Sequence, residues 1–205
     1  DLTYPDIESV DRRGAWYNTK LLRNETRIET DEYLTDELSH EAVDFIKRNR
    51  TKPFFLFLSY NAPHTPMQAS QKYLDRFEHI DDPLRRTYAA MMSAIDDGAG
   101  RVLDTLDELQ LAEKTLVFYL SDNGGARNNG SFNTPLRGYK GDVYDGGIRV
   151  PFAFRWTGNI EGGRDFNLLV SSMDILATIV GLTGVEIAED RPLDGVNLIP
   201  YLKDE

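Results

Sequence analysis

The chain has 205 residues, a length at which one modest domain buries a core without a disulfide or a structural metal. Its 34 acidic and 23 basic residues give a net charge of −11, which disfavours a nucleic-acid partner because such proteins need a basic face. No apolar run approaches the ~20 residues that span a bilayer, so no membrane partner is expected. The absence of Cys excludes disulfides and cysteine nucleophiles within the chain.

The sequence predicts an irregular segment followed by a helix in the N-terminal part of the chain. Residues 1–34 are polar and lack a clear period, so we expect the domain proper to occupy residues 35–205. A helix is predicted to begin near Thr35 or Asp36, because the following apolar residues recur at helical spacing. Basic residues follow at its carboxyl end, where the helix dipole favours them.

A second group of elements follows this helix. The apolar run at 53–60 is typical of a strand buried on both faces, and two prolines then predict a rigid loop at 61–66. Periodicity and stop signals predict the remaining elements. These are helices at 68–78, 83–110 and 172–182, strands at 115–120 and 151–156, and a long loop rich in Gly, Asn and Arg at 124–149.

This order of elements predicts an α/β fold, a mostly parallel sheet flanked by helices. In such sheets, ligands bind beyond the carboxyl ends of the strands. The two most unusual loops, at 61–66 and 121–147, both follow predicted strands. We therefore expect these two loops to form a candidate functional site.

Asp122 and Asn123 are the first candidate residues in these loops. A carboxylate and an amide at a strand end, followed by two glycines, can turn their oxygens toward one point, and such oxygens suit a hard cation such as Ca²⁺ or Mg²⁺. The alternative is a plain turn, because Asp, Asn and Gly are favoured turn residues. The segment does not fit the EF-hand pattern.

His64 and Lys140 are the second pair of candidates. His64 lies between two prolines, so a rigid loop can present its imidazole to an anionic oxygen or use it to transfer a proton. Lys140 has glycines nearby and is a point charge suited to sulfate or phosphate. The alternatives are a structural histidine and an ordinary surface lysine. Three arginines add positive charge to the same loop: Arg127, Arg137 and Arg149.

Several motifs occur in a fixed order along the chain. They are Pro-Phe-Phe-Leu-Phe-Leu-Ser-Tyr-Asn-Ala-Pro-His-Thr-Pro at 53–66, Tyr-Ala-Ala-Met-Met-Ser-Ala-Ile-Asp-Asp at 88–97, Leu-Ser-Asp-Asn-Gly-Gly at 120–125, Leu-Arg-Gly-Tyr-Lys-Gly at 136–141, Gly-Gly-Ile-Arg-Val-Pro at 146–151 and Asp-Arg-Pro-Leu-Asp-Gly at 190–195. This ordered set resembles the sulfatases of the alkaline-phosphatase-like superfamily. The resemblance implies an alkaline-phosphatase-like α/β domain, present here without its N-terminal side.

The resemblance also implies roles for particular residues. Asp122 and Asn123 match the second pair of calcium ligands, with Mg²⁺ less expected. His64 and Lys140 match groups that contact the sulfate ester and assist its cleavage, His64 as a proton donor to the leaving oxygen. Arg137 matches a supporting substrate-binding residue. The implied protein is a periplasmic or secreted sulfuric ester hydrolase that acts on a sulfated small molecule or polysaccharide.

The chain also departs from the family pattern. The family nucleophile is a formylglycine made from Cys or Ser in a Cys/Ser-x-Pro-x-Arg motif. This chain has two Pro-x-Arg sequences, and the position of the Cys or Ser is occupied by Asp81 in one and by Asn133 in the other. The early metal-binding aspartates of the family are missing too. The chain begins with Asp1 and shows no signal segment. We therefore expect a carboxyl-terminal portion of a sulfatase, inactive alone, whose formylglycine lies in the missing N-terminal part of the same domain.

Two other interpretations stay open at the level of sequence. One is a phosphoesterase or phosphonate hydrolase of the same superfamily. The other is a non-catalytic remnant. An upstream Cys/Ser-x-Pro-x-Arg motif in the reading frame would favour an enzyme over a remnant.

Overall fold

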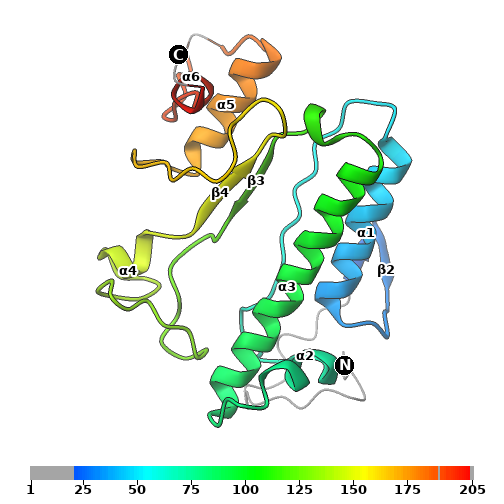
Figure 1. Ribbon diagram of the computed structural model, residues 1–205, viewed down its shortest axis with the longest axis vertical. Coiled ribbons are helices and arrows are strands. Elements are labelled where there is room, and N and C mark those ends of the chain that lie inside the picture. The colour runs from blue at the N-terminus through cyan, green and yellow to red at the C-terminus, as the bar shows by residue number, and fades with distance from the viewer. Residues whose placement is uncertain (1–20, 189, 204–205) are drawn as a thin grey trace. The chain divides into compact units, whose positions relative to one another are not determined.

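The computed structural model of the chain describes residues 21–188 and 190–203. These residues form two compact units (Figure 1). The first unit holds the described residues up to 110 together with 121–150, and the second holds 111–120 and 151–203. All five predicted site residues belong to the first unit. The predicted domain limits remain a prediction, and residues 1–20 of the predicted irregular segment lie outside the described residues.

Helix α1 (Leu34–Asn49) begins within two residues of the predicted start. Its first turn is acidic and its last turn is basic, which suits the helix dipole at both ends. Ala42 and Ile46 lie one turn apart and are buried on the face that packs into the unit. Just before α1, strands β1 (Leu21–Arg23) and β2 (Thr26–Ile28) form an antiparallel hairpin in the part of the chain predicted to be irregular.

Helix α3 (Pro83–Glu108) confirms the predicted long helix. Asp82 caps its N-terminus by accepting a hydrogen bond from the Arg85 amide at 2.6 Å, and Pro83 fits the first turn because it needs no donor there. The short helices α2 (Gln71–Leu74) and η2 (Asp75–Phe77) occupy the segment predicted as one helix at 68–78.

The core of the first unit lies where α1, α2 and α3 meet, and α1 and α3 run side by side in Figure 1. Tyr73, Met67 and Met91 are among its fully buried side chains. Gly98 of α3 permits the close approach, because a Cβ there would lie 2.3 Å from Ser39 Oγ and 2.5 Å from the Tyr60 hydroxyl. A larger residue at position 98 would force the two helices apart.

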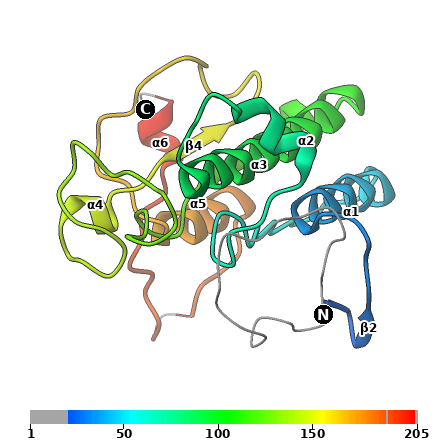
Figure 2. The same ribbon diagram turned by 90° about the horizontal axis from the view of Figure 1, so that it is seen from below.

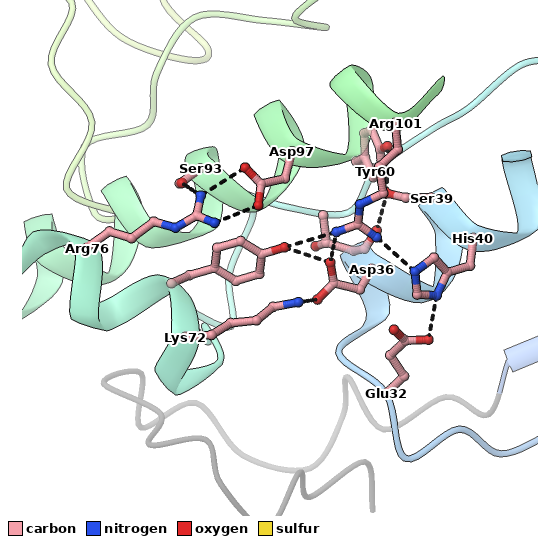
Figure 3. Close-up of polar contacts among 12 residues, drawn as sticks. Glu32, Asp36, Ser39, His40, Tyr60, Lys72, Arg76, Ser93, Asp97 and Arg101 are labelled. Atoms are coloured by element: carbon pink, nitrogen blue, oxygen red, sulfur yellow. Dashed lines mark hydrogen bonds and ion pairs between the residues drawn. The ribbon is translucent and has the colours of Figure 1, made fainter. Parts of the chain in front are cut away.

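Asp36 is the charged centre of this core (Figure 3). It is 1% exposed and accepts hydrogen bonds from the Tyr73 hydroxyl at 2.6 Å and Arg101 at 2.7 Å, while Lys72 lies 2.7 Å away as an ion-pair partner. Burial alone would raise the pKa of Asp36, but the bonds from Lys72, Tyr73 and Arg101 outweigh it and hold the pKa below its ordinary value. Asp36 therefore ties α1, α2 and α3 together as a carboxylate.

The same network continues outward from Asp36 (Figure 3). Arg101 also lies 2.9 Å from His40 Nε2, and His40 Nδ1 lies 2.9 Å from Glu32. An arginine can only donate, so Nε2 accepts and the proton of the neutral ring is on Nδ1, directed at Glu32. Burial and the hydrogen bond to Asp36 both raise the pKa of the Tyr73 hydroxyl, which stays a donor.

Residues 53–60 correct one prediction. They were expected to form a strand buried on both faces, but they belong to neither described sheet and their burial alternates. Phe54 packs edge-on against Phe45 of α1 with ring centroids 5.9 Å apart, while Phe55 and Phe57 are 72% and 78% exposed. One face therefore packs on the helices. An apolar run does not specify which segment will supply the neighbouring strand, so the pattern alone could not settle the pairing.

Strands β3 (Val117–Leu120) and β4 (Phe152–Arg155) confirm two predicted strands and pair in the second unit. They run antiparallel with Phe118 opposite Phe154. The mixture of helix and sheet confirms the α/β class. The mostly parallel pairing is not found among the described strands, since both described pairs are antiparallel. Strand order is a long-range property that periodicity does not encode.

The second unit also contains η3 (Ala112–Lys114), α5 (Met173–Thr183) and α6 (Ile199–Leu202). Helix α5 confirms the predicted helix and ends at Gly184 in a left-handed conformation, φ +67°. Buried Asp174 accepts from the amides of Ser171 at 2.7 Å and Val196 at 2.9 Å, which fixes the tail to α5. Among the described residues, no helix is long and apolar enough to cross a membrane.

Candidate functional site

His64 lies in the loop at 61–66, which is held at both ends by the core. Ala62 and Met67 are buried, whereas His64 is exposed. Its Nδ1 lies 2.8 Å from the carbonyl oxygen of Thr65. A carbonyl can only accept, so Nδ1 is the protonated nitrogen of the neutral ring and Nε2 is the nitrogen left for a ligand.

Asp122 and Asn123 lie in a bend just after β3, at the strand end where the sequence predicted them. Asp122 is exposed and Asn123 is half-buried. The bend is fixed by its neighbours, because the Gly124 amide donates to the Gly147 carbonyl at 2.9 Å. A Cβ on Gly124 would lie 1.9 Å from the carbonyl oxygen of Gly146, so only glycine fits this close approach. The turn interpretation and the ligand interpretation of Asp122 and Asn123 are therefore compatible.

Lys140 is presented by a loop that folds back on the same bend. Its backbone amide donates to the carbonyl of Gly125 at 3.0 Å. Gly138 and Gly141 take φ angles of +94° and +91°, which other residues rarely adopt, so glycine is required on both sides of the lysine. Figure 2 shows the loop at 121–149 folded back around the short helix α4 (Asp145–Ile148).

The arginines of this loop have different surroundings. Arg127 pairs with Asp142 at 2.8 Å, so its charge is neutralised locally. The Arg137 guanidinium lies over the Tyr144 ring, 3.8 Å from its centroid, and the Arg137 carbonyl accepts from the Gly146 amide at 2.7 Å. Among the described residues, neither Arg137 nor Lys140 forms an ion pair. The same is true of Arg149 in this part of the chain, so Arg137, Lys140 and Arg149 are the exposed cations of the loop that remain for an anion.

The two predicted loops are joined by Asn129. Its side-chain amide donates to the carbonyl of Pro63, the residue before His64, at 3.4 Å, and Asn129 itself is buried. Across residues 21–188 and 190–203, no hydrogen bond or ion pair links the five predicted side chains to one another. Asn129 thus links the two loops, whereas backbone bonds and the Asn133 side chain hold together the segments of the 121–147 loop.

The predicted cation ligands have the right chemistry, but they are too few to hold a cation tightly by themselves. The oxygens of Asp122 and Asn123 are hard donors of the type that calcium prefers, but calcium takes six to eight of them. In the part of the chain that the structure describes, no group of three or more acidic, His or Cys side chains gathers to hold a metal. The two side chains alone could therefore supply only part of a calcium ligand set.

Asn133 is a site residue that sequence reasoning missed. The sequence marked it only as a residue in the nucleophile position of a Pro-x-Arg motif, whereas its side chain bonds to both Gly125 and Gly138. A polar, turn-prone residue within a Gly-rich loop was the only signal available, and such residues are common in loops of every kind.

A family model described as Sulfatase matches residues 5–185. Mouse (Mus musculus) steryl-sulfatase is 39% identical over 181 residues, covering 84% of this chain and 28% of the relative. Human N-acetylgalactosamine-6-sulfatase is 35% identical over 205 residues, covering 97% of this chain and 37% of the relative. The chain thus spans about a third of the length of the curated relatives it matches.

A solved structure shows the same fold. The crystal structure of Ps i-CgsB in complex with k-i-k-neocarrahexaose superimposes with a TM-score of 0.87 at 39% sequence identity. The match covers 91% of this chain and 42% of the other. The described fold is therefore that of part of a larger α/β domain of the same kind.

Proposed function

The chain belongs to the sulfatase family, and from that premise we propose that it supplies the substrate-facing cations and two metal ligands for the hydrolysis of a sulfate monoester. The observation that supports this most directly is the bond from the Lys140 amide to Gly125 at 3.0 Å. It holds the Lys140 backbone next to the segment that follows Asp122 and Asn123. An anionic ester needs the cation and the metal ligands at once.

The cations of the loop would act on the sulfate group. Negative charge builds up on the sulfate and leaving oxygens as the ester bond breaks, and fixed cations lower the barrier by neutralising it. Lys140 is suited to this as a point charge, and the planar guanidinium of Arg137 to a supporting contact. Arg127 is less suited to bind an anion, because it is paired with Asp142.

His64 would deliver a proton to the leaving oxygen. Its Nδ1 already donates to the Thr65 carbonyl, so the second proton of the charged ring resides on Nε2 and leaves from there. The same bond keeps the ring in a fixed orientation, as a carboxylate does for other catalytic histidines. His64 therefore acts through one defined nitrogen.

A divalent cation, Ca²⁺ rather than Mg²⁺, would be held by Asp122 and Asn123 together with ligands outside this chain. When bound, it would polarise the sulfate oxygens. Calcium is favoured because it accepts irregular sets of carboxylate and amide oxygens, whereas Mg²⁺ demands a near-ideal octahedron. The formylglycine nucleophile is proposed to lie in the part of the protein upstream of this chain.

Calcium binding by the chain alone gives the first prediction. With only two side-chain ligands, we expect a dissociation constant of about 1 mM or weaker, and Asp122→Asn should abolish the residual binding. Isothermal titration calorimetry measures both. Asp145→Asn, an exposed carboxylate of the same loop, is the control and should bind as the parent chain does. A tight stoichiometric site in the parent chain would contradict the proposed split of ligands.

The substrate class is proposed from the relatives. Human N-acetylgalactosamine-6-sulfatase and the structure in complex with neocarrahexaose both point to sulfated carbohydrates, and steryl-sulfatase points to small sulfated molecules. The exposed positions of His64, Lys140 and Arg137 are compatible with a bulky polymeric ester. We propose a sulfated polysaccharide or small molecule as substrate, handled in the periplasm or outside the cell.

Activity of the separate parts gives the second prediction and the test of the proposed function. The 205-residue chain alone should not hydrolyse an aryl sulfate, because the proposed nucleophile is absent from it. The protein encoded by the complete reading frame around it should do so in a calcium-dependent way. Release of the phenol, followed by absorbance, measures both. Calcium-dependent turnover by the purified 205-residue chain would refute the placement of the nucleophile.

A further inference from the structure

Asn133 has an unusual set of partners for a loop side chain. Its Oδ1 accepts from the Gly125 amide at 3.0 Å, and its Nδ2 donates to the carbonyls of Gly125 and Gly138, each at 3.0 Å. Asn133 is half-buried, so these bonds are partly shielded from water. A carboxamide offers two donor hydrogens and one acceptor oxygen, and here both ends of the group are engaged.

These partners lie in two segments of the 121–147 loop, which together hold all the predicted site residues except His64. Gly125 follows the bend at Asp122 and Asn123, and Gly138 lies between Arg137 and Lys140. The carbonyl of Gly125 also accepts a hydrogen bond from the Lys140 amide. Gly125 therefore takes part in three hydrogen bonds, two with the Asn133 side chain and one with the Lys140 backbone. One side chain thus bridges the proposed metal-ligand bend and the proposed anion-binding segment.

The space around Gly125 leaves no room for a side chain at this position. A Cβ at position 125 would lie 2.8 Å from Asn133 Oδ1 and 2.4 Å from Ser131 Oγ. Ser131 bonds instead to the carbonyl of Ala126 at 2.8 Å, within its own stretch of the loop. Of these two polar side chains beside Gly125, Asn133 is the one that reaches the 137–140 segment.

We propose that Asn133 is a positioning residue that sets the Lys140 ammonium at a fixed place relative to Asp122 and Asn123. This inference rests on the proposed function, because it matters only if one ester contacts both groups. Asn133 acts through the backbone of Gly125 and Gly138. A displacement of about 1 Å between two groups that act on one reacting centre can lower the rate by about 100-fold.

The first test is kinetic and uses the protein encoded by the complete reading frame. Asn133→Ala should lower kcat for an aryl sulfate by about 10- to 100-fold, whereas Asn128→Ala, an exposed asparagine of the same loop, should change it less than about twofold. In a Lys140→Ala background, Asn133→Ala should lower kcat by only about threefold or less, because the group it positions is gone. Equal fold losses in both backgrounds would overturn the proposal.

The second test separates this inference from the proposed function. Amide hydrogen exchange, followed by NMR on the 205-residue chain, should become about tenfold faster at Gly125 and Lys140 in Asn133→Ala. The Lys52 amide, bonded to the Asn49 carbonyl, should not change and is the internal reference. Unchanged exchange at Lys140 refutes the positioning role. Faster exchange combined with no sulfate turnover by the complete wild-type protein leaves the positioning intact and refutes the proposed function.

A second variant guards against misfolding. Asn133→Asp keeps an oxygen for the Gly125 amide and removes both donated bonds, and Asn128→Asp is its charge-matched control. If Asn133→Ala loses its dispersed amide signals, the same exchange and kinetic comparisons are made on this pair. Faster exchange and lower kcat in Asn133→Asp but not in Asn128→Asp support the proposal, and equal values overturn it.

Discussion

Replacement of Asp36 by Asn should lower the free energy of unfolding by about 3 kcal/mol at pH 7. The carboxylate is 1% exposed, and the variant leaves Arg101 and Lys72 near a neutral amide that attracts them far less. The effect is at the lower end for a broken buried ion pair because the Lys72 side chain is 56% exposed and regains water. Urea unfolding measures it, and the thermal midpoint should fall by about 6–12 °C.

The matched control for this variant is Asp44→Asn on the same helix. Asp44 is exposed, so its replacement should change the free energy of unfolding by less than about 0.5 kcal/mol. Equal losses in the two variants would show that the Asp36 network does not stabilise the α1, α2 and α3 cluster.

The pH dependence of the Asp36 contribution has a defined sign. The folded pKa lies below the unfolded value of about 3.9, so the stabilisation is complete above that value and is lost as the pH falls through the folded pKa. The difference in stability between the parent chain and Asp36→Asn should therefore be constant from pH 5 to neutrality and shrink below about pH 4. A difference that grows with acidification would contradict the charged state assigned to Asp36.

Replacement of Lys140 by Ala should lower kcat/KM for an aryl sulfate by about 100- to 1,000-fold in the protein from the complete reading frame. The reason is the loss of a fixed positive charge where negative charge develops. The lysine is exposed and its backbone is held by its amide bond to Gly125, so Ala should leave the loop and the stability unchanged. Steady-state kinetics with an aryl sulfate and a thermal melt measure the two effects separately.

Lys52→Ala is the control for Lys140→Ala. Lys52 is exposed, lies in the same unit and lies outside the two predicted loops, so its loss changes the net charge equally. Its kcat/KM should stay within about twofold of the parent value. If the two variants lose activity to the same extent, the effect comes from overall charge, and Lys140 has no special contact with the ester.

Local elements were predictable from this sequence because their signals are local. The helix that contains Asp36 and the one that begins after Asp82 have a regular apolar spacing together with a dipole or capping signal at their ends, and both were placed within two residues. The end of α5 at Gly184 was also predictable, because glycine commonly follows the last turn of a helix. These features depend on side chains a few positions apart.

Pairing between distant segments was not predictable in the same way. Residues 53–60 have the composition of a buried strand, yet Phe55 and Phe57 are exposed and the run joins neither described sheet. The direction of β4 against β3 depends on how a long loop returns, which no residue pattern in the strands encodes.

The candidate site was located by its residues but not by its connections. The ordered motifs named His64, Asp122 and Lys140, and the family match confirms the resemblance on which those choices rest. Their individual roles stay predictions. The hydrogen bonds of Asn133 could not be foreseen, because they join residues 5 and 8 positions away through a side chain whose direction depends on the folded loop.

The most direct test of sulfate-ester hydrolysis by the complete protein is its preference between two esters. The ratio of kcat/KM for an aryl sulfate to that for the matching aryl phosphate should be well above one in the presence of calcium, and Lys140→Ala should lower the sulfate value. A phosphate preference would identify a phosphoesterase or phosphonate hydrolase on the same fold. Failure to hydrolyse either ester would favour a non-catalytic remnant, and both results would contradict the proposed sulfatase.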